Sequence, residues 1–213
     1  MTTFELDTPH GLARVHLRRA DEPTGALVLG HGAGGGVGAP DLVAAAEAGR
    51  SLGLAVALVE QPYRVAGRRS PAPARQLDAA WTAVVEHLRT HELPDAPLVV
   101  GGRSSGARVA CRTADTTGAA GVLCLAFPLQ PPARAGKPPS PSRLPELDAV
   151  NVPVLVVQGE SDRFGIPPPA AHRTVVRLRG DHSLRSDAAG LADAVREWLP
   201  RVLAHRYTAA ANA

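Results

Sequence analysis

Short apolar runs recur along the chain and alternate with segments in which apolar residues return every three or four positions. The runs are rich in Val, Leu and Ala, and they lie at 26–29, 54–59, 98–101, 121–127, 152–157 and 174–178. Uninterrupted apolar runs of this length are typical of parallel strands buried on both faces. The segments 40–52, 76–91 and 186–205 show helical periodicity instead. The alternation predicts an α/β fold, with helices on both faces of a mostly parallel sheet.

The two ends and one internal stretch depart from this pattern. Residues 3–20 contain two short strands around the turn residues 7–11, which predicts an N-terminal antiparallel hairpin. Residues 128–145 are rich in Pro, Ser, Arg and Lys without an apolar period, so we expect a long surface loop and leave open whether it forms a lid. We expect a single domain over 1–206 with no large cap domain, followed by a frayed tail at 207–213.

Composition excludes several classes of protein. Hydrophobic residues make up 45% and charged residues 20% of the 213 positions, as in ordinary globular domains. The net charge of +3, with arginines scattered among acids, does not indicate a nucleic-acid partner. No apolar run is long enough to span a membrane and no secretory leader precedes the first strand, so we expect a cytoplasmic protein. The sequence leaves the oligomeric state open.

The two cysteines, Cys111 and Cys124, fall in an expected helix and an expected buried strand. We expect both to act as small buried apolar residues with reduced thiols. Neither has closely spaced histidines, so the sequence predicts no metal site, and we expect no other cofactor.

The candidate chemistry begins at residues 102–106, which read Gly-Arg-Ser-Ser-Gly after an apolar strand and before a helical segment of small residues. This strand-turn-helix context predicts a G-x-S-x-G nucleophile elbow with Ser104 as the nucleophile. The turn brings strand and helix so close that flanking positions must be small, which Gly102 and Gly106 satisfy. The alternative interpretation is a glycine-rich turn with an ordinary helix-capping serine.

Two further segments follow later strands. Asp162 ends a Gly-containing turn after the strand at 152–157, and His182 follows the strand at 174–178. Ligands collect at the carboxyl ends of parallel strands, so we expect Ser104, Asp162 and His182 to meet there as nucleophile, orienting acid and base. Three rival acids lie close to the same segments, and we favour Asp162 over them: Asp181, Asp187 and Glu160.

A glycine-rich loop at 30–36 follows the first buried strand. We expect the backbone N–H groups of Ala33 and Ser105 to form an oxyanion hole, since a developing negative charge needs such donors. We expect His31 to hold this loop through hydrogen bonds. The residues expected to contact the substrate are Tyr63, Arg64, His31 and Arg103. An arginine cluster at 64, 68, 69 and 75 is open to three interpretations: a contact for a substrate carboxylate, a contact for an acidic partner, or a solvated charged loop.

Five segments together, at 30–34, 62–69, 102–106, 158–162 and 180–183, make residues 26–200 resemble the small dienelactone-hydrolase-related α/β-hydrolases. The Pro-Tyr-Arg and Ala-Gly-Arg-Arg pieces at 62–69 are similar to a branch that includes testis-expressed homologues and a chromatin-complex subunit. The resemblance implies triad roles for Ser104, Asp162 and His182. Relatives often carry Met and then Gly-Gly after the nucleophile, whereas Ser105, Gly106 and Ala107 stand here, which implies a different pocket shape.

These observations predict a serine hydrolase that cleaves a small carboxylic ester or thioester through an acyl-enzyme. Two alternatives remain. One is a catalytically weak or silent hydrolase-like scaffold that binds a partner. The other is a dinucleotide-binding Rossmann protein, because 30–35 also fits G-x-G-x-x-G. One feature argues against the dinucleotide-binding alternative: pyrophosphate binding needs a helix that begins within the glycines, whereas here residues 37–40 separate the glycines from the next helix.

Overall fold

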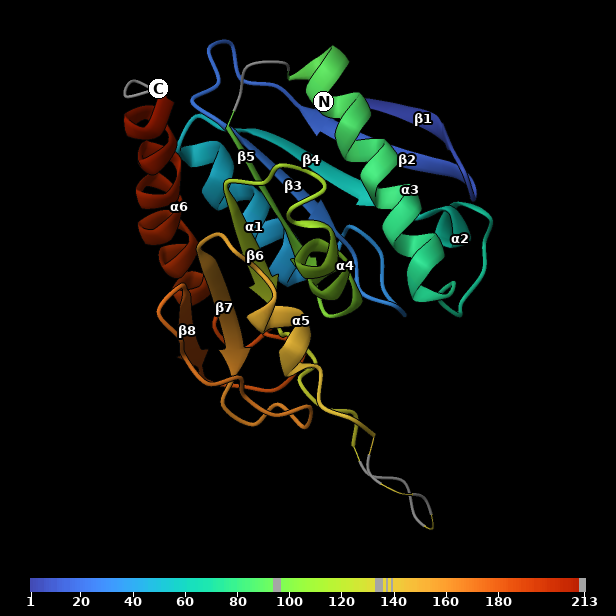
Figure 1. The fold of residues 1–213 in the computed structure, drawn as a ribbon, viewed down its shortest axis with the longest axis vertical. Helices are drawn as coiled ribbons and strands as arrows, with labels where there is room; N and C mark the ends of the chain where they lie inside the picture. Colours follow the sequence, from blue (N-terminus) through green and yellow to red (C-terminus); the bar gives the residue numbers. More distant parts are fainter. Residues whose placement is uncertain (94–96, 133–135, 137, 139, 211–213) are drawn as a thin grey trace.

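A computed structural model of the chain describes all residues except 94–96, 133–135, 137, 139 and 211–213. Its centre is an eight-stranded sheet with the order β1-β2-β4-β3-β5-β6-β7-β8 (Figure 1). The strands are β1 (Thr2–Thr8), β2 (Gly11–Arg18), β3 (Ala26–Gly30), β4 (Ala55–Glu60), β5 (Leu98–Arg103), β6 (Gly121–Leu125), β7 (Val154–Gly159) and β8 (Arg173–Leu178). The prediction of an α/β fold is confirmed.

The predicted hairpin forms the antiparallel edge of this sheet. β1 pairs with β2 in antiparallel register from Thr2 opposite Leu17 to Thr8 opposite Gly11, and β2 pairs antiparallel with β4. Every other strand pair is parallel. β2 alternates buried and partly exposed positions, as expected for a strand with one covered face, whereas β3 and β6 are buried throughout.

Helices cover both faces of the sheet. They are α1 (Pro40–Ser51), α2 (Pro62–Val65), α3 (Ala74–His87), α4 (Ser105–Thr113), α5 (Leu144–Asp148) and α6 (Ala188–Ala210), with a π-helical turn, η1 (Leu88–Glu92), after α3. α1 and α6 lie on one face, and α3, α4 and α5 lie on the other (Figure 1). The pattern of apolar residues missed α2 because its four residues are too short for a helical period.

The termini of two elements differ from the prediction. α6 continues to Ala210, past the predicted end near His205, while 211–213 lie outside the described residues. The predicted loop at 128–145 has no strand or helix in its described part before Leu144, where α5 begins. α1 begins at Pro40, after the glycine loop, so no helix starts among the glycines as a dinucleotide-binding turn requires.

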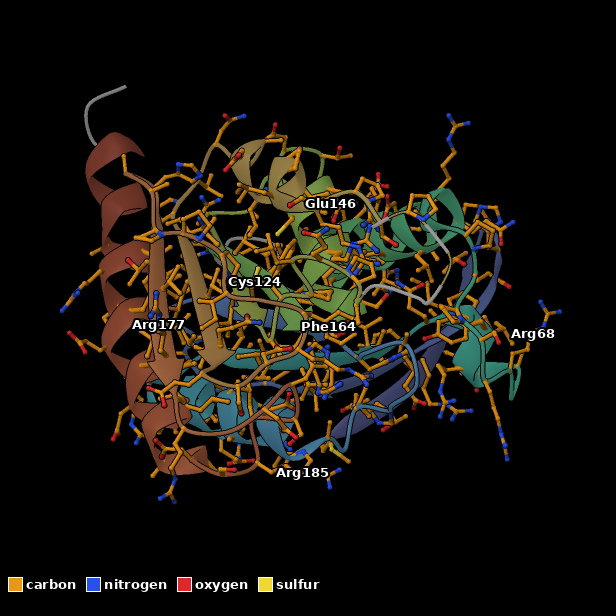
Figure 2. The ribbon with its side chains drawn as sticks, turned by 90° about the horizontal axis from the view of Figure 1, so that it is seen from below. Arg68, Cys124, Glu146, Phe164, Arg177 and Arg185 are labelled. Atoms are coloured by element: carbon orange, nitrogen blue, oxygen red, sulfur yellow. The ribbon has the colours of Figure 1, made fainter. Side chains whose placement is uncertain are left out.

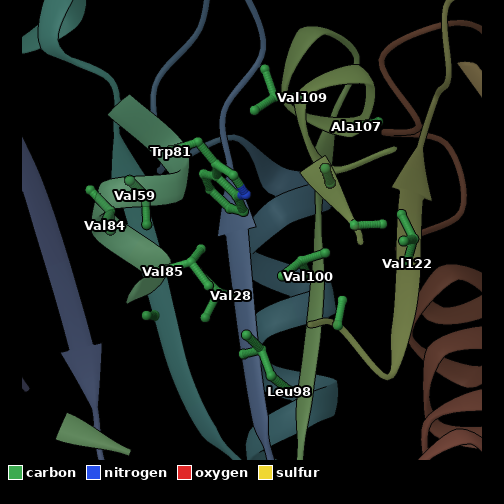
Figure 3. Packing of buried hydrophobic residues seen from close by; sticks show 14 of the residues in the cluster. Val28, Val59, Trp81, Val84, Val85, Leu98, Val100, Ala107, Val109 and Val122 are labelled. Carbon is green, nitrogen blue, oxygen red and sulfur yellow. The ribbon is translucent and has the colours of Figure 1, made fainter. Parts of the chain in front are cut away.

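Each face has its own aliphatic core. Figure 3 shows Trp81 and Val85 of α3 facing Val28 and Val59 of the sheet. Trp81 is 1% exposed and is the largest fully buried side chain. Burial of such side chains contributes about 1.5–3 kcal/mol each relative to exposure, so a sheet covered on both faces is a rigid support for the loops at its ends.

The strand order creates a switch point between β3 and β5. From β3 the chain moves through α1 on one face to β4, and from β5 it moves through α4 on the other face to β6. The loops after β3 and β5 therefore separate toward opposite faces, and open α/β sheets bind ligands in the crevice that such divergence leaves. The glycine loop and Ser104 lie at this crevice.

The glycines at the crevice yield a stability prediction. A Cβ on Gly106 would lie 2.4 Å from the Gly30 carbonyl oxygen, whereas one on Gly38 would meet nothing within 4 Å. Because the obstacle is backbone, we expect Gly106→Ala to lower the free energy of unfolding by about 3 kcal/mol, the upper end of overpacking costs. Gly38→Ala should change it by less than about 1 kcal/mol. Urea denaturation of both variants is the measurement, and equal stabilities would contradict the close approach.

Candidate active site

Ser104 lies in the turn between β5 and α4 with φ 52° and ψ −105°, a backbone conformation that non-glycine residues rarely adopt. Its N–H donates to the Leu125 carbonyl oxygen at 2.9 Å. Cβ atoms on either Gly102 or Gly106 would lie 2.4 Å from the Gly30 oxygen, so the turn packs directly against the end of β3. This packing holds the strained serine between β5 and α4.

The structure brings the three predicted site residues together. His182 Nε2 lies 3.0 Å from Ser104 Oγ, and His182 Nδ1 lies 2.7 Å from Asp162 Oδ2. The network assigns the proton of the neutral ring to Nδ1, which donates to the carboxylate and leaves Nε2 free to accept from the serine hydroxyl. The Asp162 side chain is fully buried and that of His182 is 20% exposed. A hydroxyl, an imidazole and a carboxylate thus form one continuous hydrogen-bonded chain.

Asp162 is held by two further donors that sequence reasoning missed. Gln158 Nε2 lies 2.7 Å from Asp162 Oδ2, and it also lies within 3.0 Å of the Phe127 and Gly165 carbonyl oxygens. The Phe164 N–H donates to Asp162 Oδ1 at 2.9 Å. A fully buried glutamine at the end of the apolar strand β7 is the sequence signal for this role, because a buried amide needs a partner.

Phe164 also contacts the histidine directly. Its ring centroid lies 4.5 Å from that of His182, and the two ring planes are tilted by 47° relative to each other. Figure 2, which views the molecule from below, places Phe164 near the middle of the outline. The ring covers one side of the imidazole and limits its movement.

None of the three rival acids is hydrogen-bonded to the His182 ring among the described residues. Asp181 Oδ1 accepts from the N–H and the hydroxyl of Ser183, and the hydroxyl bond is the main reason why the pKa of Asp181 is lowered. Asp187 accepts from the Gly190 N–H, and Glu160 is exposed. Among these carboxylates, Asp162 is the one within hydrogen-bond distance of the imidazole.

His31 holds the glycine loop, as expected. Its Nδ1 lies 2.8 Å from the Gly32 carbonyl oxygen, and its Nε2 accepts from the Gln61 N–H at 3.0 Å. Burial lowers the pKa of His31, which favours the neutral ring that this pair of contacts requires. Tyr63 completes the arrangement, because its hydroxyl donates to the Ala33 carbonyl oxygen at 2.9 Å.

The two expected oxyanion donors lie on adjoining segments. Ser105 is the first residue of α4, where a helical N–H has no partner within the helix. The hydrogen bonds found among the described residues include none from the Ala33 N–H. A Cβ on Gly32 would lie 3.6 Å from Ser104 Cβ, so the loop that carries Ala33 passes directly beside the serine.

The expected substrate contacts divide into two groups. Tyr63 and Arg64 lie on α2, beside a cavity of about 380 Å³ whose lining includes Tyr63. Arg103 lies elsewhere, and its guanidinium contacts Asp41 and the His182 carbonyl oxygen. Asp41 is a buried acid that sequence reasoning missed, although its place in the first turn of α1 favours a carboxylate.

The cysteines are buried on α4 and β6, as predicted, with their Sγ atoms 3.5 Å apart. Burial raises the pKa of the Cys124 thiol well above its usual range. Within the described part of the chain, no three His, Cys, Asp or Glu side chains form a group that could hold a metal ion. No helix in that part is both long and apolar enough to cross a membrane.

A mostly parallel sheet with helices on both faces, a glycine loop after its central strand and a Ser-His-Asp chain at its carboxyl edge defines the α/β-hydrolase class of fold. A family model described as an alpha/beta hydrolase domain matches residues 23–193. The chain therefore belongs to the alpha/beta hydrolase domain family. A comparison with curated proteins finds no match.

Solved structures agree with this assignment of the fold. An alpha-beta serine hydrolase homologue from Coxiella burnetii has a TM-score of 0.74 at 17% identity, covering 92% of this chain and 96% of its own. A serine hydrolase without lid from Xanthomonas campestris has a TM-score of 0.71 at 22% identity, covering 94% of each chain. Dienelactone hydrolase from Anabaena variabilis has a TM-score of 0.71 at 15% identity, covering 94% and 96%.

The lowered pKa of His31 predicts a pH dependence of stability. The unfolded chain takes up a proton at the ordinary histidine pKa and the folded chain resists it, so folding stability rises with pH across this window. The contribution is complete above the ordinary pKa and is lost as pH falls through the lowered one. We expect His31→Asn to flatten this part of the profile in urea denaturation. His10→Asn, at an exposed turn, is the control, and identical slopes in wild type and His31→Asn would contradict the prediction.

Proposed function

We propose that the protein is a serine hydrolase that cleaves small carboxylic esters or thioesters through an acyl-enzyme. The observation that carries the proposal is the chain of contacts from Ser104 Oγ to His182 Nε2 at 3.0 Å and from His182 Nδ1 to Asp162 Oδ2 at 2.7 Å. A serine hydroxyl is a weak nucleophile until an adjacent base accepts its proton, and this order of groups supplies that base.

In the proposed reaction, Ser104 Oγ attacks the carbonyl carbon as His182 Nε2 accepts the hydroxyl proton. The carbonyl π electrons move to its oxygen, and the N–H groups of Ser105 and Ala33 stabilise the resulting oxyanion. When the intermediate collapses, the bond to the leaving alcohol or thiol breaks, and His182 returns the proton to it. Water then attacks the acyl-enzyme by the same route and releases the acid. Asp162 stabilises the imidazolium throughout and stays ionised.

The first step is aided by the geometry around the serine. The φ of 52° at Ser104 puts the residue at the tip of a sharp turn, which favours exposure of Oγ toward a ligand. Ser105 directly follows the serine at the start of α4, and the loop that carries Ala33 passes beside the serine at Gly32. Loss of one oxyanion donor typically lowers the rate by about a hundredfold or more.

The finer assignments extend the resemblance noted in the sequence. We place the protein in the dienelactone-hydrolase-related group because of the serine turn at 102–106, and in the branch with testis-expressed and chromatin-complex homologues because residues 62–69 carry that branch's pattern. The structural similarity to the serine hydrolase without lid from Xanthomonas campestris supports a small substrate. We also propose that the protein works in the cytoplasm without a cofactor. The rival proposal, a silent scaffold, requires that Ser104 be unreactive.

Loss of the nucleophile is the direct test of this proposal. We expect Ser104→Ala to lower kcat/KM for p-nitrophenyl esters of short acyl chains by about a millionfold, because triad members act as one unit. A fluorophosphonate probe should label wild type but not Ser104→Ala. The control variant is Ser51→Ala, at the end of α1, which the probe should also label. Absence of labelling in folded wild type would favour the scaffold, and a background rate across all acyl lengths would count against an esterase.

The arginine cluster provides a test of substrate charge. Within the described residues, no carboxylate lies within 4.0 Å of the guanidinium groups of Arg64, Arg68, Arg69 or Arg75. Arg68 projects from the edge of the molecule in Figure 2, whereas Arg64 is half-buried on α2. We propose that Arg64 binds an acidic group of the substrate, since it lies next to Tyr63 and the loop that Tyr63 contacts.

The corresponding measurement compares two esters of equal length, a p-nitrophenyl hemisuccinate and a p-nitrophenyl butyrate. Loss of a charge-assisted hydrogen bond costs about 1.5 kcal/mol, which corresponds to about a tenfold change. We therefore expect Arg64→Gln to shift the ratio of the two KM values about tenfold against the hemisuccinate. Arg50→Gln, which removes an arginine paired with Glu47 on α1, should leave that ratio unchanged. An unchanged ratio in Arg64→Gln would exclude the proposed contact.

A further inference from the structure

The side chain of Arg103, the residue before Ser104, contacts three other segments of the chain. Its Nε lies 2.7 Å from Asp41 Oδ2 in α1, and one terminal nitrogen donates to the His182 carbonyl oxygen at 3.1 Å. The other terminal nitrogen would lie 2.9 Å from a Cβ on Gly32, so it packs against the backbone of the glycine loop. One guanidinium therefore contacts the three segments that surround the serine.

The Asp41 end of this bridge is fixed in place. The Asp41 side chain is fully buried, and its Oδ1 accepts from the Leu42 N–H at 2.9 Å. Burial raises the pKa of Asp41, while the Arg103 charge acts in the opposite direction. A buried carboxylate without its cationic partner is strongly disfavoured, so the pair holds the start of α1 against the end of β5.

The side chain of His182 is held by Asp162 and Phe164, but its main chain has few hydrogen bonds to other elements. The segment after β8 is anchored at its base, where the Ser161 N–H and hydroxyl both donate to the Gly180 carbonyl oxygen at 2.9 and 2.8 Å. Farther along it, the Leu184 N–H donates to Asp181 within the same turn. Within the described part of the chain, the hydrogen bond from Arg103 to the His182 carbonyl oxygen is the one that anchors the main chain of His182 itself to another element.

We propose that Arg103 is a positioning residue that sets His182 and the glycine loop relative to Ser104, rather than a contact for the substrate. This inference rests on the proposed function, because it concerns the alignment of the same base and nucleophile. The planar guanidinium is suited to the task, since its three nitrogens point in three directions. A lysine has one nitrogen and cannot hold all three segments, so Arg103→Lys should not restore the alignment.

The expected signature is a loss of turnover without a loss of substrate binding. A displacement of about 1 Å between catalytic groups lowers rates by about a hundredfold. We expect Arg103→Met to lower kcat for a neutral p-nitrophenyl ester by about a hundredfold, with KM within about threefold of wild type. Fluorophosphonate labelling should slow in proportion, because it depends on the same base. If Arg103→Met does not fold, Arg103→Lys retains a charge beside Asp41, and we expect a loss of at least about tenfold in kcat.

The matched control removes a neighbouring charge. Arg185 lines the same cavity of about 230 Å³ as Arg103 and Asp41, but its side chain is exposed (Figure 2). We expect Arg185→Met to stay within about twofold of wild type in kcat and KM. An equal loss in both variants would mean that general charge, and not the bridge, is responsible, and would overturn the proposal.

A readout that does not depend on turnover separates this inference from the proposed function. We expect the proton between His182 Nδ1 and Asp162 to give a downfield proton resonance, which can be assigned by its disappearance in His182→Gln. We expect Arg103→Met to broaden or shift this resonance while the circular dichroism spectrum stays folded. If wild type proves inactive, the proposed function fails, and the resonance still tests the bridge. An unchanged resonance, or a raised KM with unchanged kcat, would overturn the positioning role.

Discussion

The approach of the β5–α4 turn to the end of β3 is the contact on which the rest of the site depends. Hypothetical Cβ atoms at Gly102 and Gly106 would both fall 2.4 Å from the Gly30 oxygen, a separation that no side chain tolerates. Because the backbones are this close, α4 starts immediately after β5 and Ser104 takes up a strained conformation. The strain persists because the aliphatic cores on both faces of the sheet over-determine the position of the turn.

The strand order turns that local contact into a site. β3 and β5 are neighbours in the sheet, but their following helices cover opposite faces, so the glycine loop and the serine turn line a common crevice. The loops after β7 and β8 enter the crevice from the side of β6. Buried polar groups then align the side chains that these two loops carry. Gln158 and the Phe164 N–H orient Asp162, and Asp162 orients His182. Hydrogen bonds in a buried network of this kind are electrostatically stronger than in water, which is why each donor matters.

Most of the fold followed from local patterns. The parallel strands match the apolar runs to within a few residues, and the hairpin pairs as its turn signal indicated, because alternation and turn residues act over a few positions. The elements that were missed, α2 and α5, are four and five residues long, too short to show a period. The site residues Ser104, Asp162 and His182 were found because each follows its own strand. Asp41 was missed because its partner, Arg103, is distant in the chain. Gln158 was missed because the sequence does not show which way a polar side chain at the end of an apolar strand points, although Asp162 is only four residues away.

The sequence alone determined the types of element and the kinds of side chain that reach the carboxyl edge of the sheet, since both depend on neighbours along the chain. Tertiary structure decided which of these side chains contact one another. The contact between Ser104 and His182 joins residues 78 positions apart, and the contact that carries Arg103 to the His182 carbonyl joins residues 79 positions apart. Local propensity contains no information on such pairings. They depend on the direction each side chain takes from its backbone once eight strands are in register, and on the free-energy cost of burying a carboxylate or amide that has no hydrogen-bond partner.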